Sequence, residues 1–164
     1  QIMRIRRDAC PVIVDVGGGY AGAVIERFKD NGIDYYKFNG ANGSLAVAQG
    51  TGVKFANKRA ASYWKFREAL DPDQEGGSVI QLPRDQELKA DLAAARYTLG
   101  PRGIILEKKE DTKKRIGRSP DKGDSVVMCH SEGERLAARR LQAFTSNGGV
   151  PRNIRGYEKH KRKI

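Results

Sequence analysis

The chain has 164 residues, of which 38% are hydrophobic and 31% are charged, and its net charge is +11. This length suffices for one domain with a real core, and the composition is typical of a soluble protein. No apolar run is long enough to span a membrane, and the first apolar run is too short for a signal peptide. Cys10 and Cys129 lack metal-ligand spacing, which favours reduced thiols.

The positive charge is concentrated at the two ends of the chain. Three arginines against Asp8 give +2 near the start, and six lysines or arginines against Glu158 give +5 from residue 147 onward. We therefore expect one domain over residues 1–146 and a basic, flexible tail over residues 147–164. The tail would contact nucleic acid or simply aid solubility. Because the first residue is Gln1 rather than Met, we also expect a piece of a longer product.

Residues 11–28 predict a strand, an acidic residue, a glycine loop and a helix. The β-branched run 12–14 is typical of a buried parallel strand, and it ends at Asp15. Glycines at positions 17, 19 and 22 then match the spacing G-x-G-x-x-G of dinucleotide-binding loops, and a helix is expected over residues 23–29.

Two ligands fit such a loop. A helix N-terminus seats a pyrophosphate, whereas a carboxylate at a strand end is a natural ligand of Mg²⁺ or Mn²⁺. Asp15 would repel a pyrophosphate, and the next strand, expected over residues 35–38, is followed by Asn39 instead of a ribose-binding acid. We favour the metal and keep a dinucleotide-binding, Rossmann-like module as the alternative.

The middle of the chain predicts helices between glycine-rich and proline-containing loops. After a small-residue loop over 40–52, a helix is expected over 55–70, with Asn57 as a cap and Trp64 in the core. Its basic residues are expected to face solvent: Lys58, Arg59, Lys65 and Arg67.

Shorter elements follow. Residues 78–82 predict a short strand or extended piece, and Pro83 and Asp85 start another helix. Residues 97–99 and 103–106 flank Gly-Pro-Arg and predict a hairpin. The charged segment 107–115 predicts a solvent-facing helix.

The sharpest remaining signal is Ser-Pro-Asp-Lys-Gly-Asp at residues 119–124. Ser119 is a good N-cap and Pro120 suits the first helical position, so a helix is expected to start here. Asp121 and Asp124, three residues apart, share one face of it. The helix dipole by itself explains an acid such as Asp121 in the first turn, which makes Asp124 the better candidate for a ligand.

The order of these motifs resembles the C-terminal nuclease domain of bacteriophage terminase large subunits. The resemblance runs from Pro11 to Ala138 and rests most on SPDKGDSV after a lysine-rich segment. It implies an α/β, RNase H-like fold with a mixed sheet flanked by helices, and Mg²⁺- or Mn²⁺-dependent cleavage of concatemeric double-stranded DNA during packaging. By this resemblance Asp15, Asp124 and Asp121 are metal ligands. The same resemblance implies that Lys109 is a further catalytic residue, which would neutralise a phosphate or steady the acids.

One departure from the family pattern concerns the start of the chain. Family members carry another metal-binding Asp on a strand before the one that here ends at Asp15, and an ATPase motor before that. The only acid ahead of Asp15 is Asp8, too close for a separate strand, and no G-x-x-x-x-G-K-[ST] motif occurs. We therefore expect an N-terminally truncated nuclease domain, and whether it is an enzyme by itself stays open.

The resemblance also implies partners and a place of action. These are double-stranded DNA, the terminase small subunit, the portal and the ATPase domain, in the host cell cytoplasm and without a membrane. A further alternative is a non-catalytic packaging fragment that binds DNA through its basic ends.

Overall fold

A computed structural model describes residues 10–74, 76–78 and 80–146, with side chains up to Gly133. The chain divides into two compact units, residues 1–132 and 133–164. The elements that carry the candidate site belong to the first unit. The predicted domain boundary at residue 146 stays a prediction, and the predicted tail, 147–164, lies outside the described residues.

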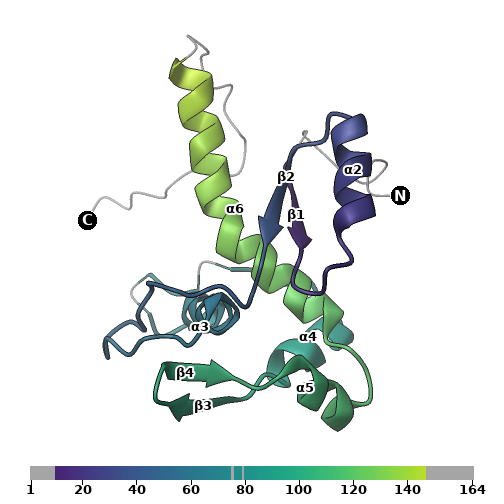
Figure 1. Ribbon diagram of the computed structural model, residues 1–164. Helices are drawn as coiled ribbons and strands as arrows, with labels where there is room; N and C mark the ends of the chain where they lie inside the picture. Colours follow the sequence, from purple (N-terminus) through teal and green to yellow (C-terminus); the bar gives the residue numbers. More distant parts are fainter. Residues whose placement is uncertain (1–9, 75, 79, 147–164) are drawn as a thin grey trace, which may run out of the picture. The chain divides into compact units, whose positions relative to one another are not determined.

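The first elements form a parallel strand pair with its connecting helix. Strands β1 (Val12–Asp15) and β2 (Tyr35–Phe38) run in the same direction (Figure 1). In their register Asp15 lies opposite Phe38. Helix α2 (Gly22–Asp30) joins them and buries Ile25 and Phe28. The strand, glycine loop, helix and second strand predicted from the sequence are confirmed, and Asp15 ends its strand.

Helix α3 (Lys58–Leu70) begins at the predicted cap rather than at Phe55. The side chain of Asn57 accepts a hydrogen bond of 2.9 Å from the backbone N–H of Ala60, which confirms the cap. Phe55 lies before the helix, where it is buried and forms an isolated bridge with Ile104. The three residues at the start of the predicted helix therefore lie outside it, as one bridge residue and two bend residues.

A short helix and a hairpin follow. Helix α4 (Gln86–Ala93) is capped by Asp85, and strands β3 (Tyr97–Gly100) and β4 (Gly103–Leu106) pair antiparallel. Gly103 has a φ of 96°, and a Cβ there would lie 2.0 Å from the carbonyl oxygen of Lys54, so this hairpin position requires glycine. Residues 78 and 80–82, where a short strand or an extended piece is predicted, lie outside any strand.

The last two helices start later than the sequence predicts. Helix α5 (Lys109–Ile116) and helix α6 (Asp121–Ser146) are separated by Gly117, whose φ is 76°. The carbonyl of Pro120 accepts the N–H of Asp124 at 3.0 Å, whereas the Ser119 hydroxyl donates to the Asp121 carboxylate at 2.5 Å. The predicted cap by Ser119 is therefore wrong, because the carbonyl of Pro120 accepts the first hydrogen bond of the helix and residue 120 occupies the cap position.

The fold is of the α/β class, with its core around α3. Both parallel and antiparallel pairing occur, in the described residues as two separate two-stranded ladders. Two clusters of buried side chains meet α3, one with Ala48, Phe55, Ala60, Ala61 and Ile104, the other with Tyr63, Phe66 and Val127. Among the described residues, we find no helix with the length and apolar character that a membrane span needs.

Candidate active site

Asp15 is presented at the carboxyl end of β1 by the glycine turn. Its Oδ1 accepts the N–H of Gly17 at 2.9 Å, and a Cβ on Gly17 would lie 3.2 Å from that same oxygen. The carboxylate is exposed. The N–H of Gly17, the first glycine of the loop, is therefore already bonded to Asp15. A bound pyrophosphate would have to compete with this carboxylate for the same N–H.

Asp124 lies in the first turn of α6 and is held by α3. Its Oδ1 accepts a hydrogen bond of 2.6 Å from the Tyr63 hydroxyl, and an Arg59 guanidinium nitrogen lies 3.5 Å from the same oxygen. Its Oδ2 lies 2.8 Å from the Lys109 ammonium. Only 13% of the Asp124 side chain is exposed, so this carboxylate is largely shielded from water. The two cations near it are Arg59 and Lys109.

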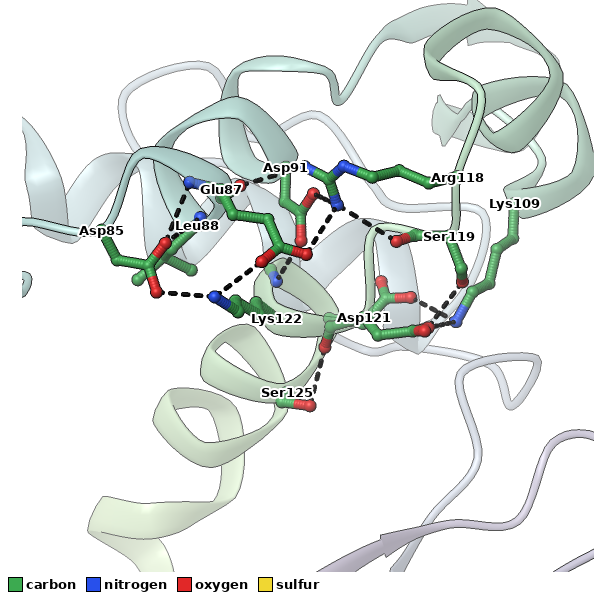
Figure 2. Close-up of polar contacts among 12 residues, drawn as sticks. Asp85, Glu87, Leu88, Asp91, Lys109, Arg118, Ser119, Asp121, Lys122 and Ser125 are labelled. Carbon is green, nitrogen blue, oxygen red and sulfur yellow. Dashed lines mark hydrogen bonds and ion pairs between the residues drawn. The ribbon is translucent and has the colours of Figure 1, made fainter.

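Lys109 joins the two acids of α6. Its ammonium also lies 3.1 Å from Oδ1 of Asp121, which is 72% exposed and accepts the Ser119 hydroxyl (Figure 2). Burial acts to lower the pKa of Lys109, but its bonds to Asp124 and Asp121 outweigh burial and raise that pKa. The Ser119 hydroxyl, and then Lys109, lower the pKa of Asp121. Lys109 thus stays charged and the exposed acid stays ionised.

Tyr63 and Arg59 were not predicted as site residues. Burial, followed by the charge of Asp124, raises the pKa of the Tyr63 phenol well above its usual range. The hydroxyl therefore stays protonated and acts as a hydrogen-bond donor to Asp124. Arg59 also donates to the carbonyl of Glu107 at 2.9 Å. Because residues 59 and 63 are four apart, they share one helix face, and this spacing is the signal that could have revealed them.

The expectation that the basic residues of α3 face solvent is wrong for two of them. Arg59 turns toward Asp124, and Lys58 forms an ion pair with the buried Glu132 of α6. A charge run on a helix cannot by itself tell a solvated face from one that packs against a distant acid.

Asp15 and Asp124 line the same pocket, although they come from opposite ends of the described chain. The pocket has a volume of about 340 Å³ and is also lined by Gly17, Arg59, Tyr63, Lys108 and Lys109. Asp121 is not among its lining residues. The structure therefore brings together Asp15, Asp124 and Lys109, and leaves Asp121 beside the pocket, tied to it through Lys109.

A larger, mostly apolar pocket of about 930 Å³ lies elsewhere, between α3, α4 and the hairpin. Its walls include Trp64, Phe66, Leu88 and Tyr97. It holds neither Asp15 nor Asp124. The chemistry of the paired acids, rather than pocket size, decides which of the two is the candidate active site.

The donor set of the smaller pocket suits a hard divalent cation. No group of three or more His, Cys, Asp or Glu side chains that could hold a metal occurs within residues 10–74, 76–78 and 80–133. Two carboxylates nevertheless fit Mg²⁺ or Mn²⁺, because Mg²⁺ in particular is commonly bound by one or two carboxylates while it keeps several waters and meets substrate phosphates. The residues that would hold the ion are Asp15 and Asp124.

No protein-family model matches the sequence, and no curated protein matches it. Solved structures do match by fold. One is a lysine-to-alanine mutant of the nuclease domain of the large terminase subunit of bacterial virus Sf6, with manganese. It matches with a TM-score of 0.54 and 21% sequence identity, and the match covers 73% of the present chain and 64% of the Sf6 chain. Another is a mutant from the same large terminase subunit with calcium: TM-score 0.54, 20% identity, 73% and 63% coverage. A third is the nuclease domain itself: TM-score 0.53, 25% identity, 73% and 64% coverage.

These likenesses define the class of the fold, which is RNase H-like and α/β. More particularly, the chain has the fold of the nuclease domain of a phage large terminase subunit, which confirms the resemblance drawn from the sequence. It spans about 64% of the length of the solved nuclease domains that it matches.

Proposed function

We propose that this chain is the nuclease domain of a phage terminase large subunit, which cleaves concatemeric double-stranded DNA with Mn²⁺ or Mg²⁺. The observation that carries the proposal is the single pocket lined by both Asp15, from a strand end, and Asp124, from a helix start. Carboxylates from distant parts of a chain converge in this way where metal ions assist phosphodiester hydrolysis. The terminase nuclease fold supports the same reading.

A divalent cation bound there would supply Lewis-acid chemistry, by activating a water and stabilising the leaving oxygen. Asp15 and Asp124 would hold it. Lys108, Lys109 and Arg59 line the pocket as cations that can meet the phosphates on either side of the cut bond. Asp121 would act less directly, by steadying Lys109 through their 3.1 Å contact.

The partners and place of action form part of the same proposal. They are double-stranded DNA, the terminase small subunit, the portal and the ATPase domain, in the host cell cytoplasm. The dinucleotide-binding alternative is less well supported, because the Gly17 N–H is directed to Asp15 and the matched folds are nuclease domains.

The test is Mn²⁺-dependent nicking of supercoiled plasmid, with Mn²⁺ binding measured in parallel by titration calorimetry. We expect Asp15→Asn and Asp124→Asn each to reduce nicking at least about 100-fold, since each removes a ligand of the ion. Asp30→Asn, an exposed acid near the end of α2, is the matched control and should leave nicking unchanged.

Two results would overturn the proposal. Nicking that persists in both ligand variants would place the chemistry elsewhere. Salt-sensitive DNA binding without nicking or Mn²⁺ binding, unaffected by either substitution, would favour the non-catalytic DNA-binding fragment instead.

A further inference from the structure

The two oxygens of Asp124 are held by groups of different kinds. Oδ1 accepts the Tyr63 hydroxyl at 2.6 Å, with Arg59 more distant at 3.5 Å, while Oδ2 faces the Lys109 ammonium at 2.8 Å. The first contact comes from a neutral donor fixed in the core. The second comes from a charged group on the wall of the pocket.

Tyr63 is immobilised by its surroundings. Only 9% of Tyr63 is exposed, and its ring belongs to the buried cluster with Phe66 and Val127. Val127 lies three residues after Asp124 on the same face of α6. The packing that buries the ring therefore also sets the distance between the hydroxyl and the carboxylate.

Arg59 reinforces this arrangement. Its guanidinium lies 5.1 Å from the centre of the Tyr63 ring. Its Nη1 donates a hydrogen bond of 2.9 Å to the carbonyl of Glu107, whereas its Nη2 is the nitrogen that faces Asp124. The Arg59 head is thus tied to the chain just before α5 while it covers the ring. Tyr63 has little freedom to turn its hydroxyl away from Asp124.

We propose that Tyr63 is a positioning residue that locks the Asp124 carboxylate so that Oδ2 is the oxygen offered to a divalent cation. This inference rests on the proposed function. A carboxylate fixed through one oxygen cannot rotate to offer the other, so an ion in the pocket meets a prepared ligand. Hydrogen-bond partners of metal ligands commonly change metal affinity by about 10- to 100-fold when they are removed.

The test is the affinity of Tyr63→Phe for Mn²⁺ alone, measured by titration calorimetry on the full chain without DNA. This substitution removes only the hydroxyl and keeps the ring in its cluster, and thermal unfolding without metal checks that the fold persists. We expect the Kd for Mn²⁺ to rise about 10-fold or more. Tyr97→Phe, the same chemical change on the half-exposed hairpin, is the matched control and should bind as the wild type does.

A double-mutant cycle separates orientation of Asp124 from a general structural effect. In an Asp124→Glu background the longer side chain no longer meets the Tyr63 hydroxyl in the same way, so adding Tyr63→Phe should weaken Mn²⁺ binding little further. A structural effect would instead give the same loss in both backgrounds, and that result would overturn the inference.

The failures of the two proposals are distinguishable. If Asp124→Asn abolishes Mn²⁺ binding while Tyr63→Phe binds with wild-type affinity, the role of Tyr63 is wrong and the metal site stands. If the wild type does not bind Mn²⁺, or Asp124→Asn binds equally well, the proposed function fails and the role of Tyr63 fails with it.

Discussion

Two glycines of α6 provide a sharp test of how this helix packs. In a helix, replacing glycine with alanine normally stabilises the fold, by about 0.5–1 kcal/mol. At Gly133 a Cβ would meet no described atom within 4 Å, so the normal gain is expected. At Gly123 a Cβ would lie 2.9 Å from the Cβ of Asp91, a distance that real Cβ atoms essentially never show.

The expected magnitude follows from what can move near Gly123. The next nearest atoms are backbone, the carbonyl carbon of Asp91 at 3.4 Å and the nitrogen of Leu92 at 3.5 Å, so α4 itself must shift. Overpacking of this kind costs about 1–3 kcal/mol, and the shift also strains the 3.2 Å hydrogen bond from the Gly123 N–H to Asp91. After the gain in helix propensity, we expect Gly123→Ala to lower the free energy of unfolding by about 1–2 kcal/mol.

The assay is urea unfolding of the wild type, Gly123→Ala and Gly133→Ala, followed by circular dichroism. The two variants should move the midpoint in opposite directions, because they share the helix and the chemical change but differ in surroundings. If Gly123→Ala stabilises the protein as much as Gly133→Ala does, the close packing of α4 against α6 is refuted.

Three further predictions concern stability. The Arg118 guanidinium lies 2.5 Å from the carboxylate of the fully buried Asp91 (Figure 2). Arg118→Ala should therefore lower the free energy of unfolding, measured by urea melts, by about 3–5 kcal/mol, and Arg118→Lys should lower it by less. Equal losses in the two variants would contradict a role for this ion pair. Asn57→Ala should cost about 1 kcal/mol in the same assay and Asn57→Ser far less, because only the alanine removes the helix cap. The hydrogen bond from Arg115 lowers the pKa of Glu107 below its usual 4.5, so this pair stabilises the fold above pH 4.5 and the contribution is lost as the pH falls through the lowered pKa. Glu107→Gln should therefore flatten the fall of stability on acidification, and an unchanged slope would show that the pair contributes nothing.

Local signals in the sequence predicted much of the fold. The β-branched run before Asp15, the cap at Asn57 and the Gly-Pro-Arg hairpin each act over a few residues, where backbone preference dominates. For the basic residues of α3, the errors came where a side chain found a partner far along the chain, Glu132 for Lys58 and Asp124 for Arg59. At the start of α6 the error is a local one, because the helix begins at Asp121 and Ser119 lies one position before the cap.

For the candidate site, the sequence by itself determined the chemistry of the acids: a carboxylate at a strand end, and another at a helix start with no local role. It also determined the α/β pattern, because strand and helix periods are written into neighbouring residues. Only the tertiary structure decided that Asp15 and Asp124 share one pocket, that Asp121 stays beside it, and that Tyr63 and Arg59 hold Asp124. The physical reason is that these contacts join residues from separate elements, and the packing of α3 against α6, not local preference, sets which of them meet.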